Sequence, residues 1–192
     1  MDMKGIKVGY AFCGSFCTLQ KSIEQLYTFH DAGAIITPIM SEIVYDTDTR
    51  FGSAESFREK VKEICDNEII HTISGAEPIG PEKLLDILII SPCTGNTLGK
   101  LASGITDSSV TMAAKAHLRN ERPLLIAPST NDALLTSAKN IGTLMAMKNV
   151  YFAPFSQDSP TLKTRSCVAL FDKIFEAAAL ALDGKQIQPI LL

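Results

Sequence analysis

The chain has 192 residues, of which 46% are hydrophobic and 20% charged, and its formal net charge is −3. A chain of this size is expected to fold as a single domain spanning residues 1–192 with a sizeable core. Its weakly negative net charge and its lack of a basic stripe argue against nucleic acid as a partner. No apolar run approaches the roughly 18 residues that a membrane helix needs. Five scattered cysteines and three histidines show no zinc spacing, so we expect no metal, and the absence of a signal peptide predicts a cytoplasmic protein.

The chain begins with alternating strand and helix patterns. Residues 6–12 form an apolar run that predicts a strand, and a turn containing Gly14 and Ser15 follows it. The next segment carries an apolar stripe over residues 19–27, which predicts an amphipathic helix. A second strand is expected over residues 34–40.

Weaker patterns follow the second strand. Ser41 starts a short helical turn, and residues 46–53 carry turn chemistry without periodicity, so we expect a surface loop there. Apolar residues at helical spacing predict an amphipathic helix over residues 57–64. Two glycines and two prolines in residues 74–81 predict an irregular, stiff loop.

A buried strand and a polar turn occupy the middle of the chain. Residues 87–90 are four consecutive apolar residues, typical of a strand covered on both faces, and Pro92 is expected to stop its hydrogen-bond ladder. Small residues with donors and acceptors then lead into a helix: Thr94, Gly95, Asn96 and Thr97. Such a turn either binds a phosphate at the start of the helix or is an ordinary connection.

The last third repeats this alternation. The patterns predict a helix over residues 110–118, a strand over 123–127, a polar cluster at 128–132, a helix over 134–145, a last strand at 150–152, a polar loop at 154–166 and a closing helix over 168–182.

The alternation of strands and helices predicts an α/β fold, a doubly wound, Rossmann-like (flavodoxin-like) parallel sheet with helices on both faces. Polar turns follow three strands, at residues 13–17, 92–97 and 128–132. Ligands bind at the C-terminal strand ends of such sheets, so we expect these turns to converge on one mononucleotide-type site. No GxGxxG motif is present, and a dinucleotide such as NAD is therefore not expected. Three cysteines beside the turns are expected to be small buried residues rather than nucleophiles: Cys13, Cys17 and Cys93.

Two of these turns resemble motifs of a known family. Residues 92–97, followed by Lys100, Gly104 and Asp107, resemble the motif after the fourth strand of the homo-oligomeric flavin-containing cysteine decarboxylases, whose relatives include the flavin prenyltransferases. Residues 127–131 resemble the second motif of that family. The resemblance covers nearly the whole chain and implies FMN as the cofactor and a homo-oligomer built from trimers.

The resemblance also implies the residues of the site. It places the FMN phosphate and ribityl chain at the first Gly-Ser turn and at Ser41. The implied FMN-binding residues are Gly14, Ser15, Ser41, Thr94, Gly95, Asn96, Thr97 and Ser129. Thr130 and Asn131 are the expected substrate-binding residues, and Arg165 is a cation that could bind a carboxylate or simply contact solvent. His71 is the catalytic candidate, with a structural role as the alternative.

Longer segments of the sequence resemble one particular branch of the family. They include residues 76–81, 105–107, 129–132 and the tail at 186–189. In that branch a flavoprotein subunit works with the dehydrogenase-like A subunit of the same synthase to oxidise dihydrodipicolinate to dipicolinate, in the mother cell of a sporulating bacterium. The resemblance therefore implies an oxidoreductase subunit with a small dicarboxylate substrate and the dehydrogenase-like A subunit as its partner.

Departures from the family pattern leave alternatives open. Thr130 stands where the family has Met, so the decarboxylase substrate clamp is not carried over, and His71 lies farther from the first motif than the family's catalytic His does. The sequence does not separate a catalytic subunit from a non-catalytic partner that binds FMN or substrate and activates the dehydrogenase-like A subunit; a flavin-dependent decarboxylase is the third alternative. Glu77 and Asp132 are the other candidate bases, but no carboxylate pair stands out, so we expect slow turnover without the partner.

Overall fold

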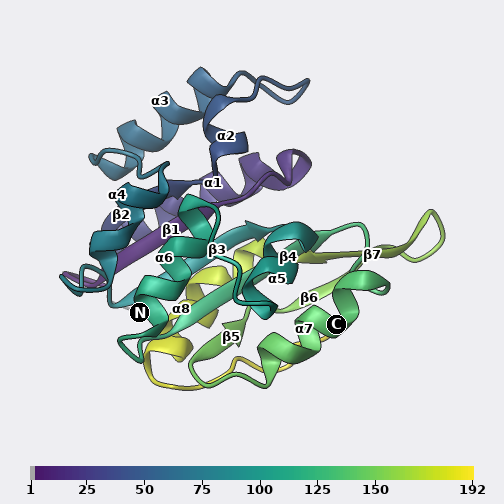
Figure 1. Ribbon diagram of the computed structural model, residues 1–192. Helices are drawn as coiled ribbons and strands as arrows, with labels where there is room; N and C mark the ends of the chain where they lie inside the picture. The colour runs from purple at the N-terminus through teal and green to yellow at the C-terminus, as the bar shows by residue number, and fades with distance from the viewer. Residues whose placement is uncertain (1–2) are drawn as a thin grey trace.

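The computed structural model describes residues 3–192 and shows a central sheet with helices on both faces (Figure 1). Its seven strands are β1 (Lys7–Phe12), β2 (Ile35–Met40), β3 (Ile87–Cys93), β4 (Leu124–Thr130), β5 (Val150–Phe152), β6 (Phe155–Ser159) and β7 (Lys163–Ala169). They lie in the order β2-β1-β3-β4-β7-β6, and β5 pairs with β4 beside this path. Strands β1 to β5 are mutually parallel, which confirms the predicted doubly wound, Rossmann-like fold.

Helices cover both faces of this sheet (Figure 1). They are α1 (Phe16–Asp31), α2 (Glu42–Asp46), α3 (Ala54–Cys65), α4 (Ile73–Ala76), α5 (Gly95–Ala102), α6 (Ser109–Leu118), α7 (Thr136–Met145) and α8 (Ile174–Leu182), with short 3-10 turns η1 (Glu77–Ile79) and η2 (Phe171–Lys173). Helices α1 and α8 pack together through the rings of Phe29 and Phe175, whose centroids are 5.1 Å apart. Helices α5, α6 and α7 cover the opposite face. Within residues 3–192, no helix is both long enough and apolar enough to span a bilayer.

The strand order determines where a ligand can bind. From β1 the chain goes to β2 on one side and later to β3 on the other, so the winding reverses between β1 and β3. Sheets with this order bind ligands beyond the C-terminal strand ends beside the reversal. All residues of β3 are buried, as are all but the first of β1, because these strands are covered on both faces.

The region after β5 differs from the sequence prediction. The pattern predicts a last strand at residues 150–152 and a polar loop at 154–166. The strand is confirmed as β5, but it is not the last one, and the expectation of a loop is wrong. Strands β6 and β7 form an antiparallel hairpin, and β7 also pairs with the end of β4, so the sheet is mixed rather than wholly parallel. The end of β4, through Thr130, extends past the parallel core and offers backbone groups that need partners. Val168 therefore belongs to β7, and the closing helix begins at Ile174.

Two smaller differences concern irregular segments. Residues 74–81 contain α4 and η1 rather than a plain loop, and Thr72 caps α4 by accepting a backbone N–H of its first turn at 3.0 Å. Strand β3 continues through Pro92 to Cys93, but its register with β4 shifts between Ile90 and Cys93. The shift accompanies the missing N–H of Pro92, so the ladder is interrupted there without ending the strand.

Candidate functional site

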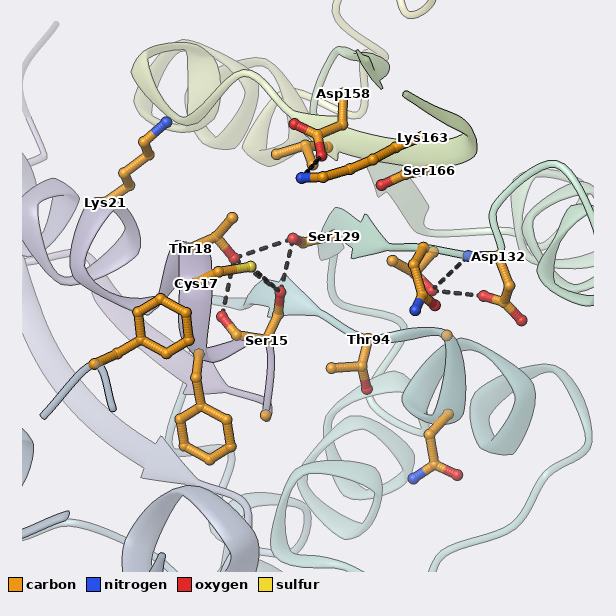
Figure 2. A pocket seen from close by; sticks show the side chains of 18 of the residues that line it. Ser15, Cys17, Thr18, Lys21, Thr94, Ser129, Asp132, Asp158, Lys163 and Ser166 are labelled. Carbon is orange, nitrogen blue, oxygen red and sulfur yellow. Dashed lines mark hydrogen bonds and ion pairs between the residues drawn. The ribbon is translucent and has the colours of Figure 1, made fainter. Parts of the chain in front are cut away.

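A cavity of about 680 Å³ lies at the C-terminal edge of the sheet. The three polar turns after β1, β3 and β4 all line it. Arg50 and Phe51, from the loop before α3, and Asp158 and Lys163, from the β6–β7 hairpin, complete its wall. Figure 2 shows the hairpin residues facing the turns across the opening. The volume is typical of pockets for small molecules and cofactors.

Three hydroxyl groups, from the first turn, the start of α1 and the end of β4, form a cluster in the cavity (Figure 2). Ser129 Oγ, at the end of β4, lies 2.9 Å from Ser15 Oγ and 3.0 Å from Thr18 Oγ1. Ser15 precedes α1 without accepting a capping hydrogen bond, and the first turn of α1 carries no acidic residue. Backbone N–H groups at a helix start with hydroxyl donors beside them suit an anion such as phosphate.

The turn after β3 is fixed by two threonines. Thr94 caps α5 by accepting a hydrogen bond from Thr97 N at 3.3 Å. The buried Thr97 hydroxyl lies 3.1 Å from Thr94 Oγ1 and donates to Cys13 Sγ at 3.3 Å. Thr97 therefore joins the turn after β3 to the turn after β1 without lining the cavity, whereas Thr94 and Asn96 line it.

Gly95 leaves room for a polar group of the third turn. Asp132 Oδ1 accepts hydrogen bonds from the hydroxyls of Thr130 at 2.6 Å and Ser137 at 2.8 Å. A Cβ atom on Gly95 would lie within 2.7 Å of all three of these oxygens, closer than carbon and oxygen can approach. The lack of a side chain at Gly95 therefore leaves the space that these oxygens occupy, and Asp132 lies on the cavity wall.

The charges in the cavity leave two cations unpaired. Lys163 and Asp158 form an ion pair at 2.5 Å, and the hydrogen bond that Lys163 donates to Asp158 raises the pKa of Lys163. Lys21 and Arg50 also line the cavity, and neither forms an ion pair with another residue of the described chain. Unpaired cations at the rim of a cavity favour an anionic ligand.

Ser41 carries a buried hydroxyl that has no hydrogen-bond partner within residues 3–192. It follows the last residue of β2 and precedes α2, and its N–H donates to Phe12 O, at the end of β1, at 3.0 Å. Its neighbour Ile43 packs against the first turn, 3.1 Å from the point where a Cβ of Gly14 would lie. Buried hydroxyls in folded proteins are nearly always satisfied, so an orphaned one beside a phosphate-type turn fits a contact with a ligand.

Most of the predicted site residues come together at the cavity. Those that line it are Gly14, Ser15, Thr94, Gly95, Asn96, Ser129, Thr130 and Asn131. Ser41 and Thr97 do not line it. His71 and Arg165 do not line the cavity. The His71 ring stacks on Tyr45, with centroids 3.7 Å apart and planes 5° from parallel, and Arg165 is exposed on β7. Their catalytic and substrate-binding roles stay predictions.

Sequence reasoning missed several residues of the cavity wall, among them Lys21, Arg50 and Phe51. Lys21 lies on α1 three positions after Thr18, so helical periodicity alone places it on the same side of the helix as the hydroxyl cluster. Arg50 and Phe51 belong to a loop without periodicity, and no local signal shows that it folds against the cavity.

The cysteines beside the turns divide into two kinds. Cys13 and Cys93 are buried, as expected, and neither lines the cavity. The hydrogen bond with Cys93 lowers the pKa of Cys13 against the effect of burial, while burial raises the pKa of Cys93. Cys17 is exposed and lines the cavity, so the expectation that it is buried is wrong. Its position in the first turn of α1 turns it away from the core.

The fold and the site identify the class of protein. The chain belongs to the Flavoprotein family, whose model matches residues 2–178, and this membership supports a flavin cofactor. Within this class, the chain is 41% identical over 191 residues to the B subunit of dipicolinate synthase from Bacillus subtilis, a match that covers 100% of this chain and 96% of that protein.

Solved structures agree with this relationship. The crystal structure of the dipicolinate synthase B subunit from Bacillus halodurans matches with a TM-score of 0.92 and 42% identity, over 100% of this chain and 98% of that one. The FMN-dependent cysteine decarboxylase SpaF shares the fold, with a TM-score of 0.67 and 17% identity over 94% of this chain and 99% of that one. Both the predicted family and the predicted branch within it are confirmed.

Proposed function

We propose that this chain is the FMN-binding subunit of a two-subunit oxidoreductase that converts dihydrodipicolinate to dipicolinate, with the dehydrogenase-like A subunit of dipicolinate synthase as its partner. It would act in the cytoplasm of the mother cell during sporulation. The observation that carries the proposal is the full-length similarity to a protein named as the B subunit of dipicolinate synthase. A cavity suited to an anion, at the winding reversal of a flavodoxin-like sheet, supports the cofactor.

The residues of the cavity fit FMN. Ser15, Thr18 and Ser129, with the N–H groups at the start of α1, would hold the phosphate, and the orphaned Ser41 hydroxyl would gain a partner from the phosphate or the ribityl chain. The turn at residues 94–97 would contact the remainder of the cofactor. One Gly-Ser turn offers a single phosphate site and no GxGxxG motif is present, which favours FMN over FAD and NAD.

The proposed reaction removes one hydride and one proton from the dihydropyridine ring. A bound flavin supplies the two-electron acceptor. The protein's task is to orient the ring, hold its carboxylates and accept the proton, and a positioned base contributes about 10²- to 10⁴-fold to such a rate. Asp132 is the candidate base on the cavity wall, and both of its hydrogen bonds go to Oδ1. His71, which the sequence favours, would have to leave its stack on Tyr45 to act there.

A second candidate function is a non-catalytic partner that binds FMN or substrate and activates the dehydrogenase-like A subunit. Both carboxylates in the cavity are already engaged, Asp158 by Lys163 and Asp132 by two hydroxyls, which favours this alternative over a self-sufficient enzyme. A flavin decarboxylase has less support, because Thr130 replaces the Met of the family's second motif.

The test compares the FMN-loaded chain alone, the dehydrogenase-like A subunit alone and the two mixed, each with dihydrodipicolinate in the absence of oxygen. Flavin reduction is followed by visible absorbance and dipicolinate formation by ultraviolet absorbance. We expect slow flavin reduction by the chain alone and rapid product formation only in the mixture, with a nicotinamide on the dehydrogenase-like partner as the final electron acceptor. Equal rates for the chain alone and the mixture would exclude the division of labour. Equal rates for the dehydrogenase-like partner alone and the mixture would make the flavin subunit non-catalytic.

A further inference from the structure

Arg50 and Phe51 form a part of the cavity wall that the proposed FMN contacts do not use. They are the two central residues of a tight turn closed by a reciprocal pair of backbone hydrogen bonds. Thr49 N donates to Gly52 O at 3.0 Å, and Gly52 N donates to Thr49 O at 3.1 Å. A turn closed in this way presents its two central side chains together at its tip.

The turn is attached firmly to the rest of the domain. Asp48 Oδ1 accepts a hydrogen bond at 2.8 Å from Ala54 N, the first residue of α3. Gly52 packs so closely on the Phe57 ring that an added Cβ would lie 2.9 Å from it. The tip is therefore held in place before a ligand binds, which lowers the entropic cost of binding.

The two side chains offer complementary chemistry. The Arg50 guanidinium lies 4.9 Å from the centroid of the Phe51 ring, and it has no acidic partner among residues 3–192. Phe51 is 46% exposed. Exposure of a phenyl ring to water is unfavourable, so a ligand that covers the ring would be stabilised. A planar guanidinium pairs with a carboxylate through two parallel hydrogen bonds, and a phenyl ring packs against another flat ring.

The other cations of the cavity are less suited to a carboxylate. Lys163 is already paired with Asp158. Lys21 lies on α1 three residues after Thr18, on the side of the helix that carries the hydroxyl group proposed to bind phosphate. Arg50 is thus the cation that remains for a second anionic group in the same cavity.

We infer that Arg50 and Phe51 form the subsite for a flat six-membered ring bearing a carboxylate, with the guanidinium on the carboxylate and the phenyl ring on the ring face. This inference rests on the proposed function and names the class of substrate that its site selects. Because oxidation makes the dihydropyridine ring aromatic and flat, the aromatic product is a suitable probe of the subsite.

The test is calorimetric titration of the FMN-loaded protein with pyridine-2,6-dicarboxylate in metal-free buffer. We expect Arg50→Gln to weaken binding about 10-fold or more and Arg50→Lys to weaken it less, because lysine keeps the charge but loses the paired hydrogen bonds. Phe51→Leu should cost about 2- to 10-fold through loss of ring packing. Arg119→Gln, at the exposed end of α6, is the matched control and should bind as the unmodified protein does. Pyridine without carboxylates should bind no more weakly to Arg50→Gln than to the unmodified protein.

Each outcome decides a separate point. If the unmodified protein binds the dicarboxylate and Arg50→Gln binds it equally well, the subsite is wrong and the proposed function stands. If Arg50→Gln instead weakens FMN binding, Arg50 anchors the cofactor and the inference is overturned. If the unmodified, FMN-loaded protein binds no aromatic carboxylate, both the subsite and the proposed substrate fall while the flavin assignment remains. Thermal unfolding of each variant verifies that a loss of binding does not come from a loss of folding.

Discussion

Replacing Gly95 with Ala is expected to destabilise the protein and to disturb the cavity together. The added Cβ would lie 2.5 Å from Asp132 Oδ1, 2.6 Å from Thr130 Oγ1 and 2.7 Å from Ser137 Oγ, so these side chains must move apart. That movement breaks or stretches the two hydrogen bonds that Asp132 accepts. Hydrogen bonds to a carboxylate contribute about 1.5–3 kcal/mol each, and partial relaxation leaves a net loss of about 2–3 kcal/mol. For a domain of this size, such a loss lowers Tm by about 4–12 °C.

The matched control is Gly142→Ala in α7, because a Cβ there meets nothing within 4 Å. Alanine favours the helix by about 0.5–1 kcal/mol, so this variant should melt slightly higher than the unmodified protein. Thermal unfolding by circular dichroism measures both variants, and flavin titration then compares their affinities. The close approach at Gly95 would be refuted if Gly95→Ala melted like the control and bound flavin unchanged.

Four further outcomes are expected. The purified protein should take up FMN at micromolar concentration with little affinity for FAD or NAD, and bound NAD or no flavin uptake in a titration would contradict this. Asn96→Ala should weaken FMN binding about 5-fold, because Asn96 is exposed in the absence of a ligand and its hydrogen bond to the ligand contributes about 1 kcal/mol. An unchanged affinity for FMN would place the cofactor elsewhere. Light scattering should report trimers or assemblies of trimers, and a monomeric mass would exclude them. Burial lowers the pKa of His117 from 6.5 to about 4. As the pH falls, the imidazole of the unfolded chain is protonated before that of the folded chain, so the free energy of unfolding decreases between the two pKa values. Urea unfolding should show a decrease of about 2 kcal/mol between pH 7.5 and 5. His117→Gln should remove this loss, whereas the exposed His30→Gln should leave it unchanged.

The parallel core follows from local patterns in the sequence. Residues 87–90 are uniformly apolar because β3 is covered on both faces. Leu19, Ile23 and Leu26 of the predicted stripe are buried on α1, whereas Tyr27 at its end is exposed. The hairpin of β6 and β7 has no such signal. Its outer residues are polar and exposed, and it exists because β7 pairs with the end of β4, a partner more than thirty residues earlier in the chain.

The same division applies to the site. Three polar turns that each follow a strand meet, because parallel strands end at one edge of the sheet, and so the convergence of residues 13–17, 92–97 and 128–132 is predictable from the strand pattern. The remaining wall depends on contacts between distant segments. The hydrogen bond that Ala54 N, at the start of α3, donates to Asp48 holds the loop of Arg50 at the cavity, and the His71 ring stacks on Tyr45 outside it. Sequence periodicity reports which face of a helix or strand is buried, whereas the direction of a loop side chain is decided only when the packed domain supplies its neighbours.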